Sequence, residues 1–227
     1  MSADKSQDEG LHVFNELAGL PASGACFLIP GPTGVLEAML TYSVPPTAFS
    51  PIAVVCHPHP LYGGTLSNKV VHMVSKAFNA LGVMALRFNF RGVGHSDGRF
   101  DHGVGEVQDM LAAVSWVRQH FARSPLWLAG FSFGSFVAYS GYRQAGAEQL
   151  LLVAPPVDRF KFAQDRGVDV PWMVIQGGAD EVVNPESVSL WVAQQPQRPV
   201  YECLDDASHF FHSRLVPLRE RIVRAWG

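Results

Sequence analysis

Short apolar runs alternate with amphipathic segments along most of this chain. Runs bounded by Gly, Pro, Asn or Asp predict strands, and continuously apolar runs are typical of strands buried on both faces. The predicted strands span residues 26–29, 35–42, 52–56, 83–88, 149–153, 172–176 and 200–204, with one more that starts at Leu126. Residues 30–34 separate the first two runs, and their Pro and Gly content predicts a hairpin there.

Between these runs, apolar residues recur at intervals of three and four, which predicts helices. The predicted helices span residues 70–81, 104–117, the segment after Ser132 through Tyr142, 186–193 and 210–226. Gly82 follows the first of them and is a typical helix stop. Strands that alternate with helices after an initial hairpin predict the α/β class, with a mostly parallel, eight-stranded sheet and helices on both faces.

The length of 227 residues allows one large core, so we expect a single domain over residues 21–227. Residues 1–20 are a polar lead-in with little to pack. No stretch of about 18 apolar residues occurs, which argues against a membrane span. Residues 1–10 are polar and acidic, unlike a signal peptide. The net charge of −3 gives no reason to expect a nucleic acid as a partner.

Three cysteines, Cys26, Cys56 and Cys203, are too few and too odd in number for a disulfide framework. All three lie in apolar, strand-like segments, so we expect buried, inert thiols and a reducing, cytoplasmic setting. Charged residues make up 16% of the chain, below the typical value of about 25%. This low content leaves room for an apolar cleft and permits a homodimer.

The run that starts at Leu126 ends in Gly130-Phe-Ser-Phe-Gly134, and a helix-compatible segment follows at once. A serine on so tight a turn between strand and helix sits in a strained backbone region with its hydroxyl facing outward. The turn leaves no room for a Cβ two residues before or after the serine, which explains both glycines. We therefore predict that Ser132 is a nucleophile, with a plain turn serine as the alternative.

A serine hydroxyl needs a base, and the base needs a group that orients it. Parallel sheets carry their functional loops at the carboxyl ends of the strands. The loop after the 172–176 strand offers Asp180, and the loop after the 200–204 strand offers His209. Asp158 is the alternative acid and His212 the alternative base.

The chain order Ser132, Asp180, His209 and the motifs around it resemble the α/β-hydrolase superfamily from about Cys26 onward. Within it, the sequence looks most like small, lidless bacterial hydrolases related to dienelactone hydrolases and simple esterases. The motifs that carry this resemblance are His57-Pro-His-Pro60, Arg91-Gly-Val-Gly-His-Ser-Asp97, the Ser132 turn, Asp180 and His209. The nucleophile is serine rather than the cysteine of dienelactone hydrolases, which argues against their lactone as the substrate.

The resemblance implies a Ser-His-Asp triad. Ser132 would attack a carbonyl carbon, and His209 would take its proton and later return it to the leaving group. Asp180 would hold the imidazole tautomer and stabilise the imidazolium.

The developing oxyanion needs backbone N–H donors, and the first expected donor is Phe133, the residue after the nucleophile. The segment 57–60 resembles the His-Gly-x-Pro loop of family relatives, which implies the amide of His59 as the second. Proline has no N–H, so His59 and Leu61 are the nearby donors beyond His57 itself.

Residues 157–171 are too few for the helical cap that the family commonly inserts after the 149–153 strand, so we expect an open site. The expected walls are apolar and comprise Leu61, Tyr62, Phe131, Phe133, Val182, Val183 and Phe210. Such walls suit a small to medium carboxylic ester, cleaved through an acyl-enzyme. A thioesterase, a serine peptidase acting on short peptides and a non-catalytic binding protein of the same fold are the alternatives.

His57 and His59 could also form a metal pair, since alternate residues on a strand share a face. No third ligand with recognisable spacing accompanies them, so we expect no metal. The glycine pairs at 63–64 and 92–94 do not match a phosphate-binding loop, and we expect no cofactor.

Overall fold

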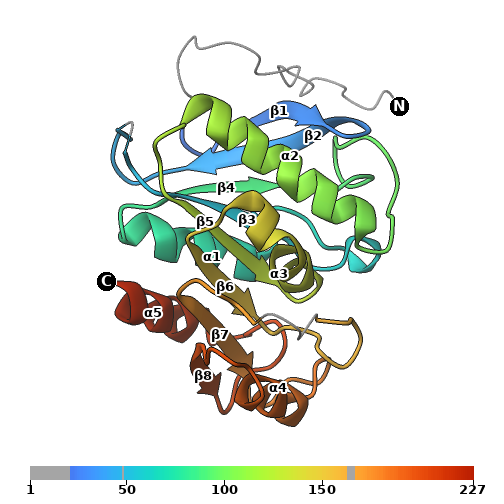
Figure 1. Cartoon of the computed structure of the whole chain (residues 1–227), viewed down its shortest axis with the longest axis vertical. Coiled ribbons are helices and arrows are strands. Elements are labelled where there is room, and N and C mark those ends of the chain that lie inside the picture. Colours follow the sequence, from blue (N-terminus) through green and yellow to red (C-terminus); the bar gives the residue numbers. More distant parts are fainter. Residues whose placement is uncertain (1–20, 48, 163–166) are drawn as a thin grey trace, which may run out of the picture.

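The computed structural model describes residues 21–47, 49–162 and 167–227. Within them lies an eight-stranded sheet in the order β1-β2-β4-β3-β5-β6-β7-β8 (Figure 1). The strands are β1 (Cys26–Gly31), β2 (Gly34–Thr41), β3 (Ile52–Cys56), β4 (Met84–Phe88), β5 (Leu126–Phe131), β6 (Gln149–Val153), β7 (Trp172–Gly177) and β8 (Val200–Leu204). β2 pairs antiparallel with β1 and with β4, and the other neighbours are parallel. The predicted lead-in at residues 1–20 lies outside the described residues.

Helices cover both faces of this sheet, as the sequence predicts (Figure 1). The helices are α1 (Lys69–Ala80), α2 (Val104–His120), α3 (Phe133–Ala145), α4 (Pro185–Ala193) and α5 (Leu215–Trp226), with a short 3-10 helix η1 (Pro60–Tyr62) after β3. Core residues of α2, α3 and α4 pack on one face, and those of α1 and α5 pack on the other.

The central strands β3, β4 and β5 are buried along their whole length. In β5, Leu126 and Leu128 belong to the core beneath α2 and α3, while Trp127 and Ala129 belong to the core beneath α1 and α5. Both faces of a central strand therefore meet apolar neighbours, which is why its sequence is a continuous apolar run rather than an alternation.

The ends of α1 follow from local sequence. The side-chain oxygen of Asn68 accepts hydrogen bonds from the amides of Val70 and Val71, which satisfies two N–H groups that the first turn leaves unpaired. Gly82, just beyond the helix, has a φ of 76°, a conformation that disfavours residues with a Cβ. The predicted stop at this glycine is confirmed.

The last helix begins later than the sequence pattern predicts. The expected helix over 210–226 is wrong at its start, because α5 begins at Leu215. Phe211 and Ser213 both have positive φ values, so the chain here is a loop rather than a helix. Pro217 supplies the physical reason: deep inside a longer helix its missing N–H would break the hydrogen-bond ladder, whereas the first turn tolerates it.

The parallel strands end at one edge of the sheet, and the loops that follow β3, β5, β7 and β8 start there. Ser132 follows β5, while Asp180 and His209 lie in the loops after β7 and β8. Between β6 and β7, the described residues contain no helix, so no cap domain interrupts this edge of the sheet.

Cysteine burial differs from expectation at two of three positions. Cys56 is buried in β3, but Cys26 is exposed and Cys203 is half-buried. These two lie on β1 and β8, the outermost strands of the sheet that the described residues form. All three thiols are free.

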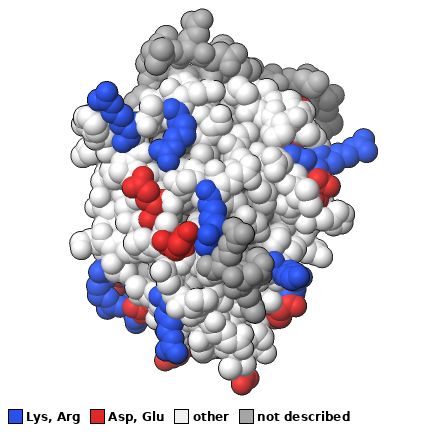
Figure 2. All heavy atoms as spheres, viewed as in Figure 1, with Lys and Arg blue, Asp and Glu red and all other residues white. Residues whose placement is uncertain are grey.

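Charges of both signs are interspersed on the face that Figure 2 shows, and neither sign gathers into a patch there. Among the described residues, no helix combines the length and the apolar character that crossing a membrane requires.

Candidate active site

The backbone at Ser132 is strained, and its neighbours explain why the chain tolerates this. Ser132 joins β5 to α3 with φ 53° and ψ −122°, outside the regions that side chains with a Cβ favour. A Cβ on Gly130 would lie 2.1 Å from the Gly134 carbonyl oxygen, and one on Gly134 would lie 2.3 Å from the Cys56 carbonyl oxygen. The predicted steric need for both glycines is confirmed.

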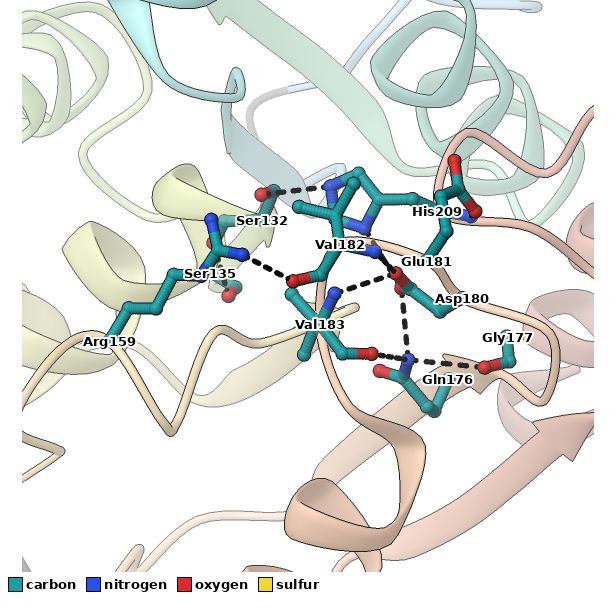
Figure 3. Close-up of polar contacts among 10 residues, drawn as sticks. All are labelled: Ser132, Ser135, Arg159, Gln176, Gly177, Asp180, Glu181, Val182, Val183 and His209. Carbon is teal, nitrogen blue, oxygen red and sulfur yellow. Dashed lines mark hydrogen bonds and ion pairs between the residues drawn. The ribbon is translucent and has the colours of Figure 1, made fainter.

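The hydroxyl of Ser132 faces the imidazole of His209, which in turn meets Asp180 (Figure 3). The distance from Ser132 Oγ to His209 Nε2 is 3.1 Å, and that from His209 Nδ1 to Asp180 Oδ2 is 2.8 Å. An ionised carboxylate only accepts hydrogen bonds, so Nδ1 carries the proton and Nε2 is left to accept from the serine hydroxyl. Three residues from three loops thus form one hydrogen-bonded chain.

Asp180 is held by more than the histidine. Its Oδ1 accepts the amides of Val182 and Val183, each at 2.8 Å, and its Oδ2 also accepts Nε2 of Gln176 at 3.0 Å (Figure 3). Burial raises the pKa of Asp180, but the hydrogen bonds from His209 and the two amides outweigh it and leave the pKa below its ordinary value. The carboxylate is therefore ionised at neutral pH.

The alternative acid and base lie elsewhere. Asp158 is exposed in a turn after β6, and His212 is exposed in the loop that also carries His209 but does not line the cavity. The His209 ring is buried, with Phe131 on one side and Phe210 on another, each at a centroid distance of 5.1 Å. The aromatic neighbours and Asp180 together fix the plane in which the imidazole lies.

His57 ties the loop after β3 to the loop after β4. Its Nδ1 donates to the Pro58 carbonyl oxygen at 2.6 Å, and its Nε2 accepts the Phe90 amide at 3.0 Å. Full burial lowers the pKa of His57 to about 3, so the ring stays neutral and this pairing persists. Since both nitrogens are occupied, the ring has no lone pair left for a metal. Across the described ranges, no three His, Cys, Asp or Glu side chains converge as a metal site requires.

Two backbone amides near Ser132 have no hydrogen-bond partner within the described part of the chain. Among the described residues, neither the Phe133 amide nor the His59 amide donates a hydrogen bond. The Leu61 amide, the other nearby donor after β3, bonds Nδ1 of His59 at 3.2 Å. The ring of His59 packs on that of Phe133 at a centroid distance of 5.0 Å, so the two segments that carry the free amides are in contact.

A cavity of about 480 Å³ opens beside the serine hydroxyl. Of the predicted walls, it is lined by Tyr62, Phe133, Val182, Val183 and Phe210, together with Ser132, His209 and His59. Leu61 and Phe131 do not line it. Leu61 is 67% exposed on the outer side of η1, and Phe131 is buried beneath the His209 ring.

Several residues of this region are absent from the sequence-based prediction. Gln176 contacts the carboxylate from the end of β7, and Glu181 accepts the backbone amide of His209 at 3.1 Å. Arg159 and Phe160, from the connection after β6, line the cavity. A polar residue at the end of an apolar strand was the available signal for Gln176. No motif marks the other three.

Two solved structures that resemble this chain over most of its length carry the same description. A solved α/β serine hydrolase homologue of Coxiella burnetii is 43% identical, covers 92% of this chain and 100% of its own, and has a TM-score of 0.87. XC6422 of Xanthomonas campestris, described as an α/β serine hydrolase without lid, is 41% identical over 91% of this chain and 96% of that chain, with a TM-score of 0.84. The chain belongs to the α/β serine hydrolases.

Among curated sequences, the uncharacterised protein RP471 of Rickettsia prowazekii (strain Madrid E) is 39% identical over 192 residues, which cover 80% of this chain and 79% of that protein. No protein-family model matches the chain. Membership of the α/β serine hydrolases confirms the predicted fold, including the absence of a cap, and makes the chain a hydrolase.

The packing of the Ser132 turn is testable by adding one methyl group. Gly134→Ala should lower the free energy of unfolding by roughly 3 kcal/mol, because its Cβ meets rigid backbone atoms of β3. Gly146→Ala is the matched control: no atom lies within 4 Å of its Cβ, and its positive φ alone should cost about 1 kcal/mol. Urea unfolding measures both. Equal losses in the two variants would contradict a steric role for Gly134.

Proposed function

We propose that this α/β serine hydrolase cleaves small to medium carboxylic esters, with Ser132, His209 and Asp180 as its catalytic triad. The observation that carries the proposal is the hydrogen-bonded chain from Asp180 through His209 to Ser132 at the mouth of a mainly apolar cavity. A serine hydroxyl that donates to an imidazole oriented by a buried carboxylate is the arrangement that activates a nucleophile.

The first half of the reaction forms an ester on the enzyme. The Ser132 oxygen attacks the carbonyl carbon of the substrate while His209 Nε2 takes the hydroxyl proton. The carbonyl oxygen becomes an oxyanion, and the unpaired amides of Phe133 and His59 stabilise it. The intermediate then expels the alcohol, which receives the proton from His209, and the acyl group remains on Ser132.

The second half uses the same groups with water as the nucleophile. His209 takes a proton from water, the resulting hydroxide attacks the acyl carbon, and a second oxyanion forms at the same two amides. Its collapse returns the proton to Ser132 and releases the carboxylic acid. Asp180 stays ionised throughout and stabilises the imidazolium in each half.

The cavity supports a substrate of limited size. Its volume of about 480 Å³ lies near the lower end of the range for ligand pockets, and Phe133, Phe160 and Val183 give it apolar walls. Hydrophobic burial of an acyl or alcohol chain against these walls would hold the scissile carbonyl beside Ser132. A small organic ester is therefore the proposed substrate. The three cysteine thiols are free, which fits the proposal that the protein works in a reducing, cytoplasmic compartment.

Removal of the nucleophile tests the proposal most directly. Ser132→Ala should lower kcat for a p-nitrophenyl ester by up to about 10⁶ and abolish labelling by a fluorophosphonate probe, because no oxygen remains to attack. The control is Ser140→Ala, at a surface serine of α3 whose hydroxyl donates to the Phe136 carbonyl oxygen. The control should keep both activity and labelling. Labelling of Ser132→Ala at the wild-type level would refute the assignment, and absence of labelling in wild type would favour a non-catalytic binding protein.

Exchange of the acid tests the orienting role of Asp180. Asp180→Asn should lower kcat by up to roughly 10⁴, because the amide favours the histidine tautomer that cannot accept the serine proton. Asp158→Asn, at an exposed position away from the imidazole, should leave kcat within about twofold. The comparison uses kcat measured on purified variants of matched thermal stability. A severe loss in Asp158→Asn with a mild loss in Asp180→Asn would transfer the role to Asp158.

A panel of matched substrates distinguishes esterase activity from peptidase and thioesterase activity. We expect p-nitrophenyl esters with short to medium acyl chains to be turned over with higher kcat/KM than the corresponding aminoacyl anilides, because the described lining of the cavity holds no carboxylate for a charged peptide N-terminus. Acyl thioesters of the same chain length complete the panel. Faster cleavage of anilides would favour a peptidase, and faster cleavage of thioesters a thioesterase.

A further inference from the structure

Arg159 brings a permanent positive charge to a mainly apolar cavity. The cavity lining includes histidines, an asparagine and a serine, but its described residues include no Asp or Glu. Arginine stays protonated at every physiological pH, so the cavity carries a cation that no carboxylate of its lining balances.

The guanidinium is held in place from one side only. Its Nη2 donates to the Val182 carbonyl oxygen at 2.7 Å, and Figure 3 shows the side chain extended from the loop after β6 toward that carbonyl. The Val182 amide donates in turn to Asp180, so Arg159 is anchored on the loop that carries the acid.

Most of the hydrogen-bonding capacity of Arg159 is unused. A guanidinium has five N–H donors, and in the described part of the chain one of its nitrogens meets an acceptor. No Asp or Glu among the described residues lies within ion-pair distance of it. Arginine presents these donors as a planar fork that matches two carboxylate oxygens, and Arg159 offers this fork at an exposed position of the cavity lining, beside Phe160 and Val182.

We propose that the ester substrate carries a carboxylate in addition to its scissile bond, and that Arg159 binds this carboxylate. The inference rests on the proposed ester hydrolysis and adds the substrate class: half-esters of dicarboxylic acids, or esters of hydroxy acids. In either case the anion pairs with Arg159 in the cavity that also holds the carbonyl beside Ser132. Arg159 is then a specificity residue, because it touches the substrate away from the reacting atoms.

Isosteric pairs of substrates test the charge alone. For a carboxylate on the acyl side, the pair is monoethyl glutarate and its ω-carboxamide. For a carboxylate on the alcohol side, it is the butanoate ester of glycolic acid and that of glycolamide. The measurement is kcat/KM from proton release, and the quantity compared is the ratio of the anionic to the neutral member of each pair.

In wild type, the ratio should exceed one in at least one pair and should fall as salt is added, because salt screens a partly exposed ion pair. Arg159→Gln should lower that ratio about tenfold or more while neutral members keep kcat/KM within about threefold. Arg159→Lys should restore part of the preference, since it keeps the charge without the fork. Arg198→Gln, at an exposed arginine that does not line the cavity, should leave the ratio unchanged.

Two outcomes would overturn the inference: no preference for the anion in either pair, or an equal loss for both members in Arg159→Gln. The second result would mean that Arg159 acts only by supporting the Val182 loop. The neutral members keep the two proposals apart. If wild type hydrolyses them and Ser132→Ala does not, ester hydrolysis stands whatever the result at Arg159, and if wild type hydrolyses no ester, both proposals fail.

Discussion

The turn at Ser132 packs directly on the end of β3, because Gly134 has no side chain to separate the two backbones. The position that a Cβ would take lies 2.3 Å from the Cys56 carbonyl oxygen and 2.5 Å from that of His57. The start of α3, which carries the Phe133 amide, and the loop after β3, which carries the His59 amide, therefore form one packed unit. His57 extends this unit to the loop after β4 through the Phe90 amide, and its neutrality keeps that bond intact. The distance between the two unpaired amides is set by main-chain packing rather than by mobile side chains.

The other half of the site depends on the surroundings of one carboxylate. Asp180 accepts four hydrogen bonds, from His209, Gln176 and the amides of Val182 and Val183, and none of these donors is free to turn away. An anion satisfied in this way stays charged although it is buried. The imidazole then has one stable tautomer, which presents its bare nitrogen to Ser132.

The sequence predicts the centre of this molecule better than its periphery. β3, β5 and β6 are apolar on both faces, so their runs are unambiguous. The carboxyl-end rule points to the loops that carry Asp158, Asp180 and His209, but topology alone does not choose between the two acids. The start of α5 is missed because Phe211 fits the helical apolar stripe, although its backbone is left-handed. Sequence position also does not reveal that the strands of Cys26 and Cys203 form the edges of the sheet.

Side-chain contacts were beyond the sequence pattern, at short as well as at long separations. Arg159 meets Val182 across 23 positions, and Gln176 reaches Asp180 only because the loop after β7 curls back over the strand end. Leu61 and Phe131 were chosen as walls for their apolarity. The direction in which each side chain points depends on η1 and on the pleat of β5, and both directions lead away from the cavity.

The absence of a helix between β6 and β7 in the described residues has a consequence for the rate of turnover. In family members with a cap, the cover must shift before reactants enter or products leave, and such movements often limit turnover. Here the described residues between β6 and β7 form no helix, so no such cover has to move before a product leaves. Discrimination between substrates must then come from a preformed shape that is already complete when the substrate arrives, not from a closing motion that adapts to it.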